Sequence, residues 1–298
     1  MKHINFINIV FFLCTASVSI SSLAQTDAGK QPRQSYTNHK PLAHHQVALE
    51  VLAASEAWIQ AFNKGQSQVC VSGYRSDAVL RAKPFGLKKG IKAIKEFWTS
   101  FLNSGAANLV YTQVSIGVIN EKTALLSANW QMNVGEGHIY QEKWVKENNR
   151  WLLAYDDFEV LKKYKRPISY TLNPVTSHKA LAQAIKASAN WIQGFNQQNA
   201  QVCGKGYAKN ATMHGVPLAY IYDQKSIETF WAGLIKQGAR NLTYHQPKFT
   251  AQTDHTVILS AQWSMNIGEG EIYQEKWIKQ ANGWVLNYDE FELLKKYL

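Results

Sequence analysis

Residues 128–146 read ANWQMNVGEGHIYQEKWVK, and residues 261–279 read AQWSMNIGEGEIYQEKWIK. The two stretches lie 133 residues apart, and 14 of their 19 positions are identical. The similarity extends well beyond them, because residues 54–164 align with residues 187–297 without a gap and share 52 of 111 positions. A repeat of this length predicts two copies of one fold within a single chain.

The order of predicted elements in each copy is helices first and strands afterwards. In the first copy, apolar residues recur at helical spacing over 45–63 and 91–103. Period-two stretches then predict four successive strands at 109–118, 123–134, 138–146 and 151–160, with a turn at 135–137 between the second and third. This order predicts an α+β fold in which N-terminal helices pack on one face of an antiparallel sheet.

The ends and the middle of the chain predict its division into parts. Residues 1–24 have a basic start, an apolar core and small residues before a cleavage point, which is typical of a secretory signal peptide. The apolar core is too short for a membrane anchor. We expect a flexible leader at 25–43, a first domain at 44–164, a proline-containing linker at 165–177 and a second domain at 178–298. The expected location is the periplasm or the medium, without stable insertion in a membrane.

Composition narrows the classes of partner. The 298 residues are 46% hydrophobic and 18% charged, as in globular proteins, and carry a formal net charge of +11. The charge favours anionic ligands or surroundings over acidic partners, and a solvated basic surface is the alternative explanation. The export signal and the lack of an Arg-rich motif argue against nucleic acid. Cys70 and Cys203 occupy equivalent positions and are expected to be buried free thiols. No motif indicates a metal or a cofactor.

Four segments carry a resemblance to a known superfamily. They are WIQAFNKG at 58–65, DAVL at 77–80, GIKAIKEFW at 90–98 and WLLAYD at 151–156. In order and spacing they resemble the nuclear transport factor 2-like superfamily, and within it the SnoaL-like and ketosteroid isomerase-like bacterial domains. The resemblance implies two tandem cone-shaped, cystatin-like domains, each a strongly bent sheet wrapped round helices with a pocket at the open end. Members include isomerases, dehydratases, cyclases and non-catalytic binding modules, so the fold leaves the function open.

The isomerases' catalytic pattern does not transfer to this chain. Where the resemblance implies an Asp that abstracts a proton, the sequence has RAKP at 81–84 and HGVP at 214–217. The helix Tyr that supports the oxyanion in those enzymes falls at Trp58 and Trp191, which have no hydroxyl group. Steroid isomerisation is therefore not expected.

Two carboxylates per copy are candidates for acid–base chemistry. Strand alternation puts Glu142 on one face with Tyr140 and Trp144, and Glu275 repeats this arrangement beside Tyr273. If that face lines the cone, burial would raise the pKa of the carboxyl group. A structural Glu paired with Lys or Arg, or one facing solvent, is the competing interpretation. The last strand of each copy adds two further candidates, Asp156 and Asp289. A carboxylate at a turn or on the surface is the competing interpretation for both. If adjacent strands bring Asp156 level with Glu142, the two would form a carboxylate pair.

The candidate ligand-binding residues are aromatic side chains of the cone and side chains of its rim. Core packing is the alternative for the tryptophans. Between positions 75 and 91 the copies share only 2 of 17 residues, which is consistent with different ligands, one degenerate pocket or neutral drift. The candidates are Trp58, Arg81, Lys83, Trp130, Tyr140, Trp191, His214, Trp263 and Tyr273.

Three functions remain open from the sequence. The first is an exported tandem pocket protein that binds a small organic molecule, anionic or aromatic, without catalysis. The second is an isomerase-, dehydratase- or cyclase-like enzyme that uses Glu142 and Glu275, or Asp156 and Asp289, as acid and base. The third is a dimerisation or interaction module, with the copies packed as an internal pseudo-dimer or the chain forming a homodimer.

Overall fold

A computed structural model describes residues 40–168 and 173–297. The predicted signal peptide at 1–24 and the leader as far as residue 39 lie outside the described residues. The described residues form one compact unit. None of the helices in the described part of the chain is both long and apolar enough to cross a membrane.

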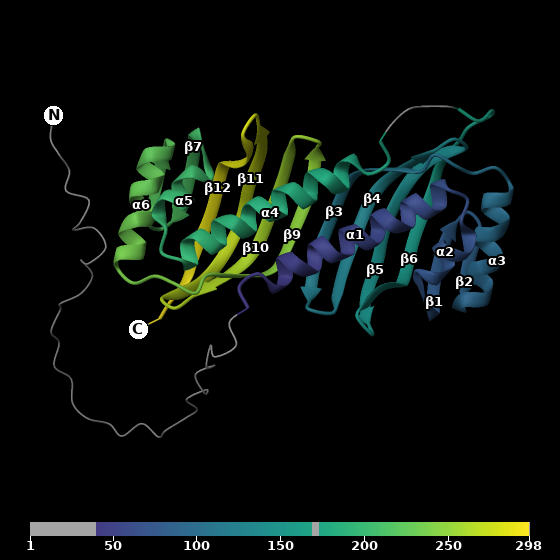
Figure 1. The fold of residues 1–298 in the computed structure, drawn as a ribbon, viewed down its shortest axis with the longest axis horizontal. Helices are drawn as coiled ribbons and strands as arrows, with labels where there is room; N and C mark the ends of the chain where they lie inside the picture. The colour runs from purple at the N-terminus through teal and green to yellow at the C-terminus, as the bar shows by residue number, and fades with distance from the viewer. Residues whose placement is uncertain (1–39, 169–172, 298) are drawn as a thin grey trace, which may run out of the picture. The chain divides into compact units, whose positions relative to one another are not determined.

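Both copies contain the same elements in the same order (Figure 1). The first copy consists of α1 (Ala43–Asn63), α2 (Ser67–Ser72), β1 (Tyr74–Lys83), β2 (Gly86–Lys89), α3 (Gly90–Asn103), β3 (Val110–Asn120), β4 (Thr123–Met132), β5 (Gly135–Glu147) and β6 (Arg150–Lys163). The second consists of α4 (Thr176–Asn196), α5 (Ala200–Lys205), β7 (Tyr207–Val216), β8 (Ala219–Tyr222), α6 (Gln224–Lys236), β9 (Thr243–Thr253), β10 (Thr256–Met265), β11 (Gly268–Gln280) and β12 (Gly283–Lys296).

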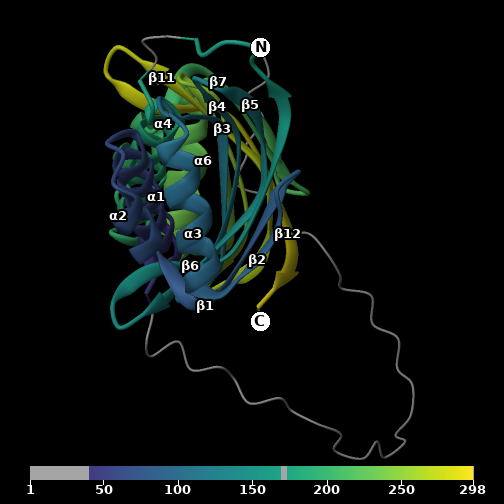
Figure 2. The same cartoon turned by 90° about the vertical axis from the view of Figure 1, so that its right-hand side faces the viewer.

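The strands of both copies form one continuous twelve-stranded sheet. Its order is β2-β1-β6-β5-β4-β3-β9-β10-β11-β12-β7-β8, so β3 and β9 join the copies at the centre. The helices lie on one face of this sheet, and the strands curve around them (Figure 2). This arrangement confirms the predicted α+β class. The sheet is not purely antiparallel, however, because β1 pairs with β6 and β7 pairs with β12 in parallel.

The glycines at 135 and 137 are part of β5 and do not form the predicted turn, which lies at residues 133–134. Each permits a close backbone approach. A Cβ on Gly137 would lie 1.9 Å from the Glu159 carbonyl oxygen and 2.6 Å from Trp130 Cζ2. The repeated glycines therefore allow β5 to lie against β6 and the Trp130 ring.

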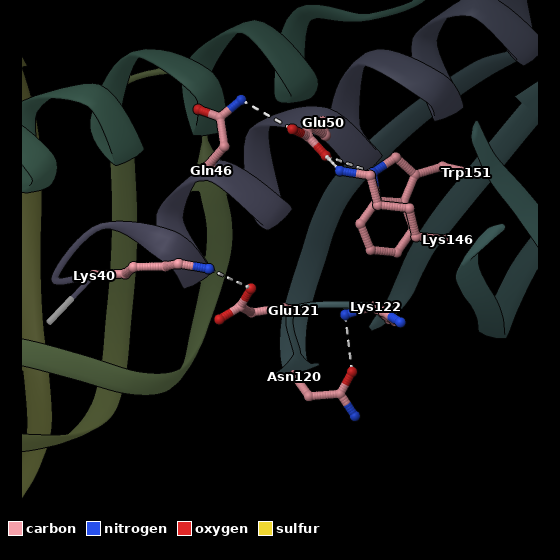
Figure 3. A network of polar contacts seen from close by, with 8 residues as sticks. All are labelled: Lys40, Gln46, Glu50, Asn120, Glu121, Lys122, Lys146 and Trp151. Carbon is pink, nitrogen blue, oxygen red and sulfur yellow. Dashed lines mark hydrogen bonds and ion pairs between the residues drawn. The ribbon is translucent and has the colours of Figure 1, made fainter. Parts of the chain in front are cut away.

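A polar network fixes α1 to the β5–β6 hairpin of its own copy (Figure 3). The Glu50 carboxylate on α1 accepts hydrogen bonds from Lys146 Nζ at 2.7 Å and from Trp151 Nε1 at 2.8 Å. In the second copy Gln183 takes this position and accepts a hydrogen bond from Trp284 at 3.0 Å. The indole donor is retained, and only the ion pair differs between the copies.

The copies meet through equivalent surfaces around an approximate two-fold axis. On the helices, His45 Nε2 lies 3.0 Å from Ser188 Oγ, and His178 Nε2 lies 3.0 Å from Ser55 Oγ. The offset of 133 residues makes these two contacts equivalent. In the sheet, Ile116 of β3 lies opposite Phe249 of β9, again at equivalent positions. The contacts have the reciprocal form of an isologous dimer interface.

Candidate functional site

A cavity lies between the helices and the inner face of the first copy's sheet. Its empty volume is about 350 Å³, which includes space open to solvent. Aromatic and aliphatic side chains form most of the wall, and neither Lys nor Arg contributes to it. The lining residues are Trp58, Phe62, Trp98, Phe101, Leu109, Tyr111, Trp130, Met132, Ile139, Asp156 and Phe158.

The wall is nearly the same in both copies. Ten of the eleven lining positions carry the same residue 133 positions later, and the one difference is Leu234 in place of Phe101. Trp191 and Trp263 take the positions of Trp58 and Trp130, and both are buried. The two copies therefore contain the same set of inward-facing groups.

Two carboxyl groups lie opposite each other on β5 and β6, and Asp156 is the one that lines the cavity. Glu142 of β5 is the register partner of Asp156 of β6, and both are buried, at 3% and 5% exposure. Within the described residues, neither forms an ion pair with a Lys or Arg. Both the surface interpretation and the ion-paired interpretation are thus wrong for these carboxyl groups, and the alternative of a level carboxylate pair is correct.

Neutral hydrogen-bond donors hold each carboxyl group in place. Glu142 accepts hydrogen bonds from the Tyr111 hydroxyl at 3.0 Å and from Trp144 Nε1 at 2.8 Å. Asp156 accepts a hydrogen bond from the Tyr74 hydroxyl at 2.6 Å, and Trp98 Nε1 donates to that hydroxyl at 3.1 Å. These donors orient the pair without neutralising its charge.

The electrostatics favour a proton on this pair at neutral pH. Burial, the largest cause, and the nearby charge of Asp156 raise the pKa of Glu142 from 4.5 to about 8, against the opposing effect of its two hydrogen bonds. Burial likewise raises the pKa of Asp156 from 3.8 to about 7. Two buried carboxyl groups side by side titrate as a unit. The pair can therefore donate or accept a proton close to pH 7.

The second copy reproduces this arrangement. Glu275 accepts hydrogen bonds from the Tyr244 hydroxyl at 2.6 Å and from Trp277 Nε1 at 2.7 Å. Asp289 accepts one from the Tyr207 hydroxyl at 2.6 Å. Burial raises the pKa of Glu275 to about 8 and that of Asp289 to about 7.

One buried donor in the cavity wall lacks a partner. Trp130 is 5% exposed, and its Nε1 has no hydrogen-bond partner among the described residues. The equivalent Nε1 of Trp263 is also without a partner there. By contrast, Trp58 Nε1 donates to the Cys70 carbonyl oxygen at 3.0 Å. An unpaired buried N–H is rare in proteins, so this donor of a cavity-lining residue is a candidate for a ligand contact.

Five predicted ligand-binding residues lie on the outer face of the sheet, away from the cavity. Tyr140 is 46% exposed on the outer face of the sheet, because a β-bulge at Tyr140 and Gln141 switches the side-chain alternation before Glu142. The same register shift in β11 turns Tyr273 outward. The remaining three alternate with buried neighbours and also face outward: Arg81, Lys83 and His214. These three side chains, which were predicted to form a pocket rim, are therefore on the opposite face of the sheet.

Sequence reasoning missed the tyrosines that donate to the carboxyl groups. Tyr74 and Tyr111 are far from the acids in sequence, but both are identical in the second copy, at Tyr207 and Tyr244. That identity was an available signal. Burial and the adjacent acids raise the pKa of both phenols well above 10, so they remain protonated donors.

Cys70 and Cys203 are free and buried, in agreement with the sequence-based prediction. Burial raises the pKa of each thiol to about 12. Among residues 40–168 and 173–297, no group of three or more His, Cys, Asp or Glu side chains is positioned to hold a metal ion.

Comparison with known proteins identifies similar folds only among solved structures. No family model and no curated protein matches the chain. A cystatin-like protein of unknown function from Nostoc punctiforme is 17% identical, with 38% of this chain and 89% of that chain covered at a TM-score of 0.34.

Two further solved structures are similar to part of this chain. A nuclear transport factor 2-like protein of unknown function from Pseudomonas putida is 15% identical over 43% of this chain and 97% of that chain, with a TM-score of 0.35. A ketosteroid isomerase-like protein from Erwinia carotovora atroseptica is 9% identical over 39% and 97%, with a TM-score of 0.35.

Proposed function

We propose that the chain is an exported binding protein whose copies each hold a small, neutral, largely apolar molecule with a hydrogen-bond acceptor, such as a carbonyl oxygen. The observation that carries this proposal is the unpartnered Trp130 Nε1 in the cavity wall. An acceptor oxygen on a ligand would satisfy this donor, and the aromatic wall would cover the apolar remainder. Export rests on residues 1–24 alone.

The chemistry of the wall argues against an anionic ligand. No cation lines the cavity, and Asp156 belongs to a pair with a raised pKa. A bound anion would add a further buried negative charge beside this pair without a counter-ion. The expectation of an anionic ligand, which rested on the net charge, therefore loses its support in the cavity.

A matched set of ligands tests the binding proposal. Naphthalene, 2-naphthol and 2-acetylnaphthalene have the same apolar body and differ in the oxygen that they carry. Tryptophan fluorescence titration should show tighter binding of 2-acetylnaphthalene than of naphthalene to the full chain. The variant Trp130→Phe should remove this preference but leave the binding of naphthalene similar. No binding of any of the three, or the same preference in the variant, would contradict the proposal.

A second candidate function is acid–base catalysis by the carboxyl pair. Its support is specific: Asp156 belongs to the cavity wall, and its pKa of about 7 suits proton transfer at neutral pH. Exchange of the methyl protons of 2-acetylnaphthalene in D₂O, followed by NMR, tests it. Catalysed exchange that is lost in Asp156→Asn and retained in Glu159→Gln, on the outer face, would favour an enzyme. Exchange at the uncatalysed rate would contradict the enzyme hypothesis and would leave ligand binding as the proposed function.

A further inference from the structure

The two copies differ in charge on the outer face of the sheet. The outer face is formed by side chains of β1, β2, β5 and β6 in the first copy and of β7, β8, β11 and β12 in the second. This face is opposite the cavity, so its differences leave the inner wall unchanged. Most of the side chains predicted to form the pocket rim lie here.

In the first copy, two cations of β1 neutralise the acids of β6. Arg81 is the register partner of Asp157, and its Nη1 lies 3.3 Å from Asp157 Oδ2. Lys83 is the register partner of Glu159, and its Nζ lies 3.7 Å from Glu159 Oε2. The same ammonium group lies 5.1 Å from the ring centroid of Tyr140, whose hydroxyl donates to Glu159 at 2.7 Å. Tyr140 and Glu159 together thus hold an ammonium ion.

In the second copy the same holding residues are present without their cation. Tyr273 and Glu292 replace Tyr140 and Glu159, and the Tyr273 hydroxyl donates to Glu292. The register partner of Glu292 is Val216, at the position of Lys83. No Lys or Arg in the described part of the chain forms an ion pair with Glu290 or Glu292. The groups that hold an ammonium ion in one copy therefore lack a built-in ammonium in the other.

Other substitutions on this face make the second copy still more acidic. The cation Arg81 is replaced by His214, whose Nδ1 lies 3.5 Å from Glu290 Oε1. His138 is replaced by Glu271, the register partner of Glu292. The pKa of Tyr273 is raised by its hydrogen bond to Glu292, and the charges of Glu271 and Glu290 add to this effect. Three carboxylates consequently act on one exposed tyrosine, in a chain with a net charge of +11.

The second copy has two further exposed aromatic side chains on this face. Tyr220 and Tyr222 are 56% and 61% exposed, and they replace Leu87 and Lys89. The Tyr220 ring contacts those of His214 and Tyr222 at centroid distances of 5.1 and 5.0 Å. Exposed rings beside carboxylates favour organic cations, because the ring face attracts positive charge and the ring body covers methylene groups.

We propose that the outer face of the second copy binds a linear aliphatic diamine, with one ammonium group at Glu292 and Tyr273 and the other at Glu290. The first copy shows the same arrangement with built-in cations, because Arg81 and Lys83 lie at the two acids of β6 that correspond to Glu290 and Glu292. Residues two apart on one strand are separated by about 6.6 Å, which is close to the span of an extended four-carbon diamine. Neighbouring Tyr220 supplies the apolar contact.

Calorimetric titration of the full chain with 1,4-diaminobutane at pH 7 and low ionic strength tests the site. One molecule should bind, and n-butylamine, which has a single ammonium group and resembles a lysine side chain, should bind on the order of tenfold more weakly. The variant Val216→Lys should weaken diamine binding by at least about tenfold, because it restores the cation of the first copy. Glu292→Gln should have the same effect by removing the acceptor.

Matched variants distinguish this site from a general surface effect and from the cavity. Glu159→Gln changes the equivalent acid of the first copy and should leave diamine binding unchanged. Trp130→Phe should also leave it unchanged, so this proposal and the proposed function can fail separately. Absence of binding, equal affinity for the two amines, or full binding by a folded Val216→Lys variant would overturn the inference.

Discussion

Replacing Glu142 by Gln is expected to stabilise the protein at alkaline pH and to leave its stability nearly unchanged at acidic pH. Gln has the same shape and is always neutral. Its carbonyl oxygen can accept the hydrogen bond from Trp144 Nε1, and its amide can donate to the Tyr111 hydroxyl oxygen. The variant therefore resembles the protonated form of Glu142.

The size of the effect follows from proton linkage. The pKa of Glu142 rises from 4.5 to about 8 on folding, so the folded state binds the proton more tightly than the unfolded state. Stability is then lost as the pH rises through this interval, up to a total of about 5 kcal/mol. Because Asp156 titrates together with Glu142, this figure is an upper value. At pH 5 the variant and the wild type should differ by about 1 kcal/mol or less.

Urea unfolding followed by tryptophan fluorescence at pH 5, 7 and 9 measures the difference directly. Comparing variant with wild type at each pH cancels other titrations, including those of His45 and His178, whose pKa values burial lowers to about 3 and 4. Glu275→Gln should repeat the result in the second copy. A Glu142→Gln variant that is less stable than wild type at pH 9, or that shows no pH-dependent difference, would refute a protonated buried pair.

Three further predictions concern packing, the contact between the copies and the thiols. Gly137→Ala should lower the free energy of unfolding by about 3 kcal/mol in thermal or urea unfolding, because the new Cβ would lie 1.9 Å from a carbonyl oxygen of β6; an unchanged midpoint would contradict the close approach. Ser188→Ala should lower it by about 1 to 3 kcal/mol, since His45 Nε2 would lose its buried partner, and Ser55→Ala should match it because its contact is equivalent. The two buried thiols should not react with an aromatic disulfide reagent at pH 8 until urea unfolds the chain, and rapid reaction of the native protein would show that they are accessible.

The sequence was sufficient for the α+β class and the order of most elements because two copies of one pattern support each other. Helix α1 begins two residues before its expected start at His45, and the last strand of the first copy extends to Lys163. Periodicity identifies such elements, but it does not reveal a bulge. The extra residue at Tyr140 reversed the predicted face of every residue before it in β5. This is why Tyr140 was placed in the pocket with Glu142.

The candidate site could be predicted only in part for a related reason. Glu142 and Asp156 were identified by their neighbours in sequence, whereas their donors Tyr74 and Tyr111 come from other strands. Local pattern contains no information about such long-range pairs. Parallel pairing of β1 with β6 also escaped prediction, because strand pairing across the whole copy depends on how the sheet closes around the helices.

The facing of Ile116 and Phe249 at the centre of the sheet has an evolutionary consequence. In a homodimer, one gene supplies both sides of the two-fold axis, so every substitution occurs twice and equivalent residues must tolerate each other. Within one polypeptide, each substitution occurs once. An isoleucine can therefore complement a phenylalanine at the axis, and an acidic outer face can arise in one half while the other keeps its lysine and arginine. Joining the halves in one chain made it possible for two equivalent surfaces to acquire separate specificities.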